Sequence, residues 1–193
     1  MAATPKHFTA YSLEDSDGVN RHDFAALLSE EDLQLTYLPG FKVVLQQAQP
    51  LEVMCMYSRY GLSMAHEDMV PACLHGDFNN GLLRKEWGWT SGFMVSDCDC
   101  IADVWKTHKY VSTPGNASAL GVLGGCDLDC GATYSDATGL PQALKAGLVQ
   151  EADLDTALTR VFASRFAVGD LDDPTLPWIA PYASINGSML DSP

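Results

Sequence analysis

Short apolar segments alternate along this chain with segments that carry helix-type residues and turn signals, and this alternation constrains the fold most strongly. The apolar segments of strand length are residues 8–11, 51–57, 92–96 and 126–130. The helical segments are residues 29–47, 79–87, 101–107, 116–124, 141–147 and 151–168. Strands and helices in this order predict right-handed β–α–β units, and therefore an α/β fold with a parallel sheet built from four such units.

Some helix signals are specific enough to check against a structure. Ser29 followed by Asp32 matches a capping box and predicts a helix start, and Pro39-Gly40 predicts an interruption of that helix. The last helix has an apolar face formed by Leu154, Leu158, Val161, Phe162 and Phe166. Four prolines follow residue 169, so we expect one domain over residues 1–173 and an irregular tail over residues 174–193.

The charge balance excludes several classes of partner. The 193 residues contain 11 lysines and arginines against 25 aspartates and glutamates, which gives a net charge of −14. Such an acidic protein is repelled by nucleic acid and by anionic membrane surfaces, so we expect neither as a partner. No apolar run approaches the roughly 20 residues that a membrane-spanning helix needs.

Six cysteines and two glycosylation sequons indicate a secreted origin. The cysteines are an even set, which permits three disulfides in 15 connectivities, at Cys55, Cys73, Cys98, Cys100, Cys126 and Cys130. The sequons begin at Asn116 and Asn186. The first residues carry no apolar core of the kind that a secretory signal has, which conflicts with a secreted origin. One resolution is that Met1 is not the native start of the ancestral protein.

Candidate site residues follow from the rule that parallel α/β folds place working residues at the carboxyl ends of strands. The rule selects Lys6, His7, Tyr57, Asp97 and either Asp127 or Asp129. A carboxylate directly after a strand, such as Asp97, suits a nucleophile, a general base or a metal ligand, and its structural alternative is a helix N-cap. Lys6 and His7 suit the binding of ligand hydroxyls. Tyr57 offers a hydroxyl and an aromatic face, or it packs as a half-buried ring.

Other chemistry-bearing residues have weaker signals. Asp99 and Asp103 are expected to be helix caps or solvated charges. Trp87 and Trp89 suit stacking on a sugar ring, or packing at a helix end. The cysteines at 98, 100, 126 and 130 lack the paired C-x₂-C spacing of a zinc site, and residues 66–68 lack the H-E-x-x-H pattern of a metalloprotease. We therefore expect no metal.

Several ordered motifs carry a resemblance to a known family. The most specific is Leu-Arg-Lys-Glu-Trp-Gly-Trp over residues 83–89, which runs into Gly-Phe-Met-Val-Ser-Asp-Cys over residues 92–98. The other matches lie at residues 6–11, 32–42, 53–57, 70–73, 113–114, 127–131 and 157–162. With these motifs the sequence resembles glycoside hydrolase family 3, nearest to its plant and fungal β-xylosidase/α-arabinofuranosidase and β-glucosidase branch.

The resemblance implies part of a (β/α)8 TIM-type barrel, with this chain covering strands five to eight. It implies that Asp97 is the catalytic nucleophile, that Lys6 and His7 are the substrate-binding pair after strand five, and that Tyr57 is an active-site aromatic after strand six. The implied chemistry is retaining hydrolysis of terminal β-xylosyl, β-glucosyl or α-arabinofuranosyl residues in plant-type polysaccharides. It implies no cofactor and an extracellular location.

Departures from the family pattern qualify that expectation. A complete barrel takes about 250 residues, strands one to four have no counterpart here, and no residue matches the acid/base Glu of the family. We therefore expect little activity from this chain alone, and self-association through open barrel edges. The alternative is a non-catalytic carbohydrate-binding or interaction protein. For the disulfides, Cys55–Cys73 and Cys98–Cys130 are the candidate pairs, because each links a strand end to a nearby loop.

Overall fold

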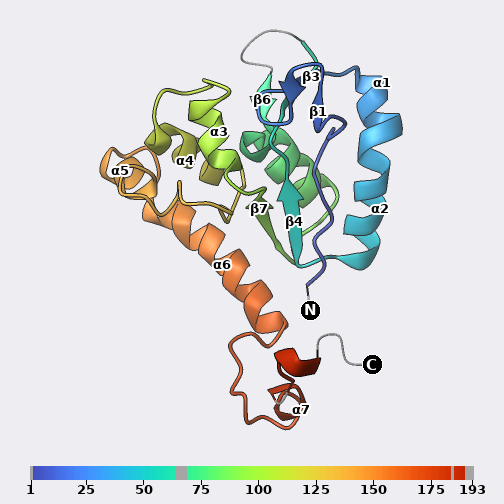
Figure 1. The fold of residues 1–193 in the computed structure, drawn as a ribbon, viewed down its shortest axis with the longest axis vertical. Coiled ribbons are helices and arrows are strands. Elements are labelled where there is room, and N and C mark those ends of the chain that lie inside the picture. The colour runs from blue at the N-terminus through green and yellow to red at the C-terminus, as the bar shows by residue number, and fades with distance from the viewer. Residues whose placement is uncertain (1, 64–68, 184, 190–193) are drawn as a thin grey trace.

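Four parallel chain segments form the centre of the computed structural model, which describes residues 2–63, 69–183 and 185–189 (Figure 1). Strand β4 (Glu52–Cys55) pairs in parallel with β7 (Phe93–Ser96). On the outer side of β4 Phe8 forms a parallel bridge to Cys55, and on the outer side of β7 Leu128 forms one to Val95. The predicted α/β class is therefore confirmed. The assignment of these segments to strands five to eight of a barrel stays a prediction.

The first and last of the expected strands are shorter than the sequence predicts. Ala10 has a φ of 64°, which turns the chain away from β4 after one bridge. At the other edge, the amides of Asp127 and Leu128 both donate to the carbonyl of Met94, so the ladder does not continue in regular register. Each outer segment is thus a single bridge rather than a strand.

Two small sheets occupy a region that the sequence analysis left without strands. The hairpin of β1 (Asp15–Ser16) and β2 (Val19–Asn20) turns at Asp17 and Gly18, whose φ angles are 53° and 82°. A positive φ at both turn positions is the type I′ geometry that Asp-Gly favours. The second sheet joins β3 (Ala25–Leu27) in parallel to β5 (Arg59–Gly61), and β5 in antiparallel to β6 (Val70–Pro71).

The first long helix begins as predicted but is not interrupted at Pro39. Ser29 and Asp32 form the capping box at the start of α1 (Glu30–Asp32). A wider π-type turn over Leu33–Tyr37 then leads directly into α2 (Leu38–Ala48). The amide of Leu38 donates to the carbonyl of Leu33 across this wide turn, and Pro39, which lacks an amide proton, occupies the first turn of α2, where none is needed. The expected interruption at Pro39-Gly40 is therefore wrong.

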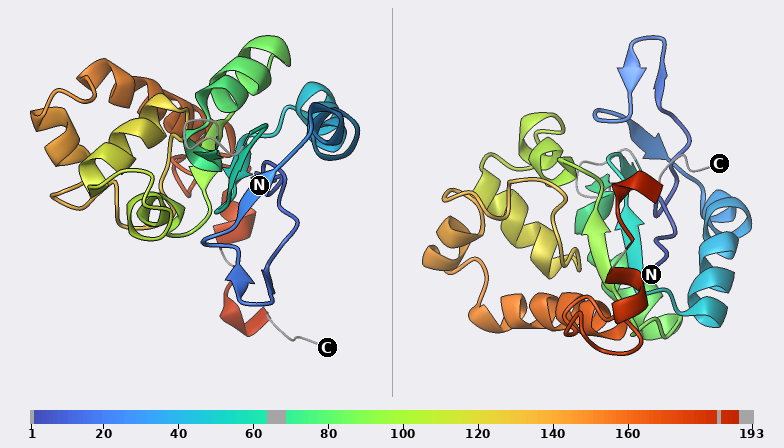
Figure 2. Two further views of the ribbon diagram at one scale, coloured as in Figure 1. Left: turned by 90° about the horizontal axis from the view of Figure 1, so that it is seen from above. Right: turned by 60° about the horizontal axis from the view of Figure 1, so that its bottom comes forward.

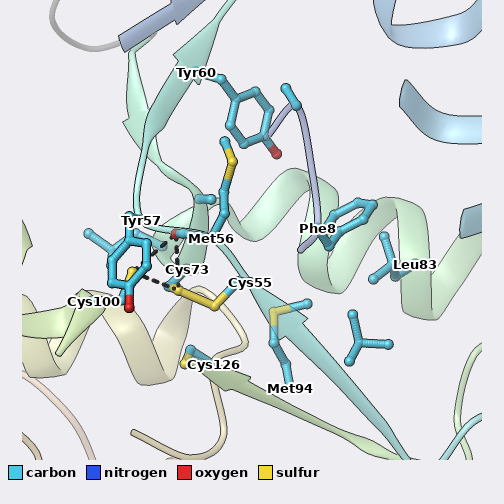
Figure 3. Close-up of a cluster of buried hydrophobic side chains, with 14 of the residues drawn as sticks. Phe8, Cys55, Met56, Tyr57, Tyr60, Cys73, Leu83, Met94, Cys100 and Cys126 are labelled. Atoms are coloured by element: carbon cyan, nitrogen blue, oxygen red, sulfur yellow. Dashed lines mark hydrogen bonds between the residues drawn. A yellow bond between two sulfur atoms is a disulfide. The ribbon is translucent and has the colours of Figure 1, made fainter. Parts of the chain in front are cut away.

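The remaining helices lie on both flanks of the central strands. They are η3 (Asp77–Glu86), α3 (Cys100–Lys106), α4 (Pro114–Leu123), α5 (Leu140–Lys145) and α6 (Glu151–Ala167). The ribbon views in Figures 1 and 2 place α2 on one side of the β4–β7 pair and α3, α4 and α5 on the other. The core between them includes Phe8, Leu83 and Met94, each at most 1% exposed (Figure 3).

Helix α6 buries only part of the apolar face that the sequence predicts. Ala157 and Ser164 are its buried positions, and the Ser164 hydroxyl donates to the carbonyl of Leu51 over 3.1 Å. Leu154 and Val161 are half-buried, whereas Leu158, Phe162 and Phe166 are 50%, 41% and 63% exposed. The segment that was expected to be irregular contains α7 (Ala180–Ala183) and a 3-10 turn (Gly187–Met189).

Two disulfides link the ends of the central strands to neighbouring loops. Cys55 is bonded to Cys73, with Cα atoms 5.2 Å apart, and Cys98 is bonded to Cys130, with Cα atoms 4.3 Å apart. These are the two pairs that the sequence analysis named as candidates. Within the described ranges, no helix has the length and apolar character to cross a membrane.

Candidate active site around Asp97

Asp97 stands at the carboxyl end of the parallel pair because its main chain extends the sheet. Its amide donates to the carbonyl of Cys55 over 3.0 Å, one residue beyond the end of β7. The carboxylate therefore leaves the sheet at its edge, with 13% of the side chain exposed. The strand-end rule placed this residue correctly.

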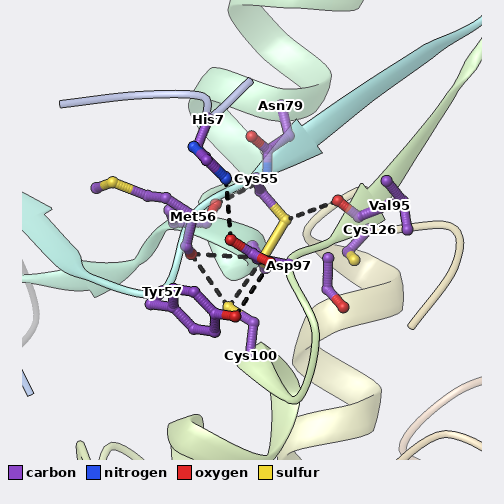
Figure 4. Close-up of a disulfide and its surroundings, with 12 residues drawn as sticks. His7, Cys55, Met56, Tyr57, Asn79, Val95, Asp97, Cys100 and Cys126 are labelled. Atoms are coloured by element: carbon purple, nitrogen blue, oxygen red, sulfur yellow. Dashed lines mark hydrogen bonds and ion pairs between the residues drawn. A yellow bond between two sulfur atoms is a disulfide. The ribbon is translucent and has the colours of Figure 1, made fainter. Parts of the chain in front are cut away.

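Three hydrogen-bond donors from three parts of the chain face this carboxylate (Figure 4). His7 Nε2 lies 3.1 Å from Asp97 Oδ2. The hydroxyl of Tyr57 donates to Asp97 Oδ1 over 3.0 Å, and the amide of Cys98 donates to the same oxygen over 2.8 Å. The carboxylate does not cap α3, since the N-cap position belongs to Asp99. The N-cap alternative for Asp97 is therefore excluded.

His7 is held as a neutral donor beside the carboxylate. Burial lowers the pKa of His7 below 6.5, which outweighs the raising effect of Asp97, and the charge of Lys6 lowers it further. A neutral imidazole carries one N–H, and the carboxylate contact assigns it to Nε2. The ring also stacks on Tyr11, with centroids 4.7 Å apart. His7 can therefore donate to Asp97 without adding a positive charge.

Tyr57 is likewise held as a donor. Burial raises the pKa of Tyr57 above 10.0, and the negative charge of Asp97 raises it further, so the phenol keeps its proton. The guanidinium of Arg21 lies 4.7 Å from the centre of its ring, and the His22 ring centroid is 4.4 Å away. His108 Nε2 lies 2.8 Å from the Tyr57 carbonyl oxygen, which fixes the main chain. The ring of Tyr57 is therefore packed against Arg21 and His22, and its hydroxyl donates to Asp97.

Lys6 stands apart from this cluster. Its side chain is exposed. Within the described part of the chain, the Asp97 carboxylate contacts His7, Tyr57 and the amide of Cys98. Lys6 instead lines a hollow of about 390 Å³, together with His7, Tyr11 and Glu14. The structure thus brings His7 and Tyr57 to Asp97 and leaves Lys6 at the rim.

Asp127 is a structural carboxylate. Arg84 Nη2 lies 2.6 Å from its Oδ2 and Arg160 Nη1 lies 2.7 Å from its Oδ1, while the amide of Met94 donates to Oδ2. Burial lowers the pKa of Arg84 to about 10. Asp127 precedes the bridge at Leu128, so it sits at the opposite end of that segment from the site. The strand-end rule selected Asp127 because the sequence does not show that this segment pairs only at Leu128, after Asp127.

Asp129 is also occupied by protein groups. Its Oδ1 accepts from the Ser96 hydroxyl over 3.2 Å, and its Oδ2 accepts from the Tyr134 amide over 3.0 Å. Both contacts fix the turn that follows Leu128 and place the carboxylate in a structural role.

Asp103 is not the solvated charge that the sequence suggested. It is buried, and its Oδ2 lies 2.6 Å from His22 Nδ1 while Oδ1 accepts from the Thr107 hydroxyl. The His22 ring of this pair also contacts the ring of Tyr57, with centroids 4.4 Å apart. The sequence analysis did not select Arg21 and His22, whose signal was their polarity directly after β2.

The tryptophan and zinc alternatives have direct structural answers. Trp89 is fully buried, its indole N–H donates to the Pro50 carbonyl over 2.7 Å, and Arg84 lies 4.6 Å from its ring centre. It is therefore a packing residue. Cys98 and Cys130 are bonded to each other, so they do not form the zinc site that was considered. Residues 66–68 lie outside the described residues.

Sequence comparison gives a consistent set of relatives. The family model described as the glycosyl hydrolase family 3 N terminal domain matches residues 1–164. The chain is 37% identical over 195 residues to a "probable exo-1,4-beta-xylosidase" of Aspergillus clavatus, covering 100% of this chain and 24% of that protein. It is 34% identical over 194 residues to a β-xylosidase/α-L-arabinofuranosidase of Medicago sativa subsp. varia, covering 100% and 23%. The chain thus spans about a quarter of the length of these relatives.

Structural comparison agrees. A solved family 3 exo-β-xylosidase in complex with a xylobiose aziridine probe matches with a TM-score of 0.83 and 28% identity, over 93% of this chain and 22% of that one. A β-glucosidase involved in saponin metabolism from intestinal bacteria matches with a TM-score of 0.76 and 28% identity, over 92% and 21%.

Proposed function

Because this chain belongs to the glycosyl hydrolase family 3 N-terminal domain family, we propose that it carries the nucleophile side of a retaining β-glycosidase site, with Asp97 as the nucleophile. The observation that carries the proposal is the carboxylate at the sheet edge, oriented by His7, Tyr57 and the amide of Cys98. A nucleophile that must meet an anomeric carbon in line needs this kind of fixed orientation.

The contacts differ between the two carboxylate oxygens and select one of them for attack. Oδ1 accepts from Tyr57 and from the Cys98 amide, whereas Oδ2 contacts His7. Oδ2 therefore keeps a lone pair available for bond formation. It attacks the anomeric carbon, the glycosidic C–O bond breaks, and the aglycone leaves with its oxygen protonated by a general acid. Water then releases the sugar from the glycosyl-enzyme.

A second carboxyl group is required about 5–5.5 Å from the first in a retaining enzyme. No residue of this sequence matches the acid/base Glu that the family resemblance implies, and we propose that another polypeptide segment supplies the general acid. Loss of general acid catalysis typically removes a 10²–10⁴-fold contribution. The chain alone should accordingly hydrolyse ordinary aryl glycosides slowly.

The proposed substrate is an oligosaccharide with a terminal β-xylosyl residue, as the names of the relatives suggest. Lys6 at the rim and His7 beside the carboxylate are the proposed hydroxyl-binding pair. The two disulfides support an extracellular location, since disulfides persist in oxidising compartments.

The test uses a substrate that does not need a general acid. Dinitrophenyl 2-deoxy-2-fluoro-β-xyloside has a leaving group that departs unprotonated, so the nucleophile alone can form the glycosyl-enzyme. We expect a single fluoroxylosyl adduct on the peptide that contains Asp97, detected by mass spectrometry. Asp97→Asn should abolish the adduct.

Asp99→Asn is the matched control. Asp99 is exposed and has a φ of 63°, a conformation that Asn tolerates. This variant should label like the unaltered chain. An adduct on another residue, or binding of xylo-oligosaccharide in calorimetry with no adduct from the activated substrate, would refute the nucleophile assignment.

A further inference from the structure

A cluster of four cysteine sulfur atoms lies near the proposed nucleophile and has no part in the proposed reaction (Figures 3 and 4). Cys55, the last residue of β4, is bonded to Cys73, which lies in the 3-10 helix Ala72–Leu74. Cys100 and Cys126 are free, buried thiols. The sulfur atoms of Cys55, Cys73 and Cys126 all lie within 4.8 Å of one another. Free thiols beside a disulfide are the reactants of thiol–disulfide exchange.

The contact that matters most joins Cys100 to Cys73. Their sulfur atoms lie 3.2 Å apart without a bond between them. The Cys100 thiol also faces the carbonyl oxygen of Met56, 3.1 Å away. All of these side chains are fully buried, so packing holds the thiol against the disulfide.

We propose that Cys100 exchanges with the Cys55–Cys73 disulfide to give a Cys73–Cys100 disulfide and a free Cys55 thiol. The sulfur of Cys100 attacks Cys73 Sγ, and a new S–S bond forms as the bond to Cys55 breaks. Cys55 leaves with the electron pair and takes up the proton that Cys100 loses. One disulfide and one thiol are present before and after, so no oxidant or reductant is consumed.

The exchange moves the disulfide partner of Cys73 from Cys55, near Tyr57, to Cys100, near Asp97. Cys55 precedes Tyr57 by two residues, and Cys100 follows Asp97 by three residues. In the present pairing the end of β4 is tied to the 3-10 helix. In the alternative pairing the first turn of α3 is tied there instead, and the strand end that carries Tyr57 is released. The two isomers therefore hold the hydroxyl of Tyr57 and the carboxylate of Asp97 by different constraints.

The surroundings of the thiol make the exchange slow at neutral pH. Burial raises the pKa of Cys100 well above its usual range, and the nearby Cys126 and the carboxylates of Asp103, Asp97 and Asp129 raise it further. Only the thiolate attacks, so the rate should rise about tenfold per pH unit below that pKa. Cys55 and Cys73 are bonded to each other, so with Cys126 they do not offer three thiolates to a metal ion.

Disulfide mapping of the 193-residue chain tests the exchange. The chain is incubated without added thiol at pH 6 and pH 8.5, quenched in acid, alkylated, digested and analysed by mass spectrometry. We expect a Cys73–Cys100 linked peptide that accumulates over 100-fold faster at pH 8.5, at a rate independent of protein concentration. Cys100→Ser should abolish this peptide, and Cys126→Ser should leave it.

A second variant keeps the test decisive. In Cys55→Ser the native bond cannot form, and oxidised glutathione should drive Cys73 and Cys100 into one disulfide. Failure to detect the Cys73–Cys100 peptide in both proteins overturns the proposal. A rate that depends on protein concentration, or a Cys55–Cys126 or Cys73–Cys126 peptide in its place, overturns it as well.

Discussion

The imidazole of His75 stacks on the buried ring of Tyr60, with ring centroids 4.8 Å apart. Burial lowers the pKa of His75 from 6.5 to about 4, and the nearby Asp77 raises it only in part. The folded protein therefore binds this proton less well than the unfolded chain. A group of this kind adds stability above its unfolded pKa, and the contribution is lost as pH falls through the folded pKa.

The free energy of unfolding should accordingly decline between about pH 6.5 and pH 4. The shift of His75 alone corresponds to about 3 kcal/mol. His75→Gln should flatten the decline, as measured by urea denaturation at pH 7 and pH 4.5. An equally steep decline in the variant would show that other groups cause it.

The two arginine partners of Asp127 should contribute differently to the free energy of unfolding. The side chain of Arg84 is 9% exposed and that of Arg160 is 28% exposed. Asp127→Asn leaves Arg84 buried without a counter-charge, which should cost about 3–5 kcal/mol of unfolding free energy. Arg160→Met should cost less, because Arg84 still pairs with Asp127. Chemical denaturation checks both, and equal losses would contradict this account.

Tyr57→Phe removes one donor from Asp97 and keeps the ring. The Tyr57 hydroxyl orients the carboxylate, and misplacing a reacting group can cost about 100-fold in rate, so the rate of labelling by the activated fluoroxyloside should fall about 10–100-fold. The melting temperature should change little, since Arg21 and His22 still contact the ring. Tyr182→Phe, at a tyrosine of α7 that is 70% exposed, is the control and should label normally.

The exposed side chains of α6 predict self-association of the isolated chain. Leu158, Phe162 and Phe166 repeat at four-residue spacing and are each at least 41% exposed. Exposed apolar patches promote association, so light scattering should show particles larger than 20.9 kDa. Phe162→Ser combined with Phe166→Ser should shift them towards the monomer mass. A monodisperse 20.9 kDa particle from the unaltered chain would contradict the prediction.

The two sequons should differ in use on secretion from a eukaryotic host. Asn186 is exposed, whereas Asn116 lies in the first turn of α4 and its sequon partner Ser118 is fully buried. An extended, accessible segment suits the modification, so glycan should be found at Asn186 in greater amount. Peptide mapping after glycosidase treatment measures both sites, with Asn186→Gln as the control.

Local signals with a definite chemistry predicted part of this molecule. The capping box at Ser29 and the convergence of His7 and Tyr57 on Asp97 follow from turn chemistry and from the parallel strand order. The continuation of the helix through Pro39 could not be predicted from such signals. A single wider turn over Leu33–Tyr37 places Pro39 in the first turn of α2, where its missing amide proton breaks no hydrogen bond. The burial of the apolar face of α6 was not predicted correctly, since periodicity shows that a helix is amphipathic but not that its apolar face is covered.

The burial of Asp103 could not be predicted from spacing. A carboxylate enters the interior only when a partner meets it, and that partner, His22, lies 81 residues away in sequence. The same holds for the sulfur cluster, in which Cys55 and Cys100 are 45 positions apart. Contacts of this range depend on the assembled fold.

The hydrogen bond that the Asp97 amide donates to the carbonyl of Cys55 has a consequence for how such a site can change. The main chain of the proposed nucleophile is fixed by this hydrogen bond at the end of the sheet, whereas Lys6 is an exposed side chain at the rim. Substitutions at such a rim position can alter which sugar is accommodated while the carboxylate stays in place. Sugar preference can diverge in this architecture without rebuilding the chemistry.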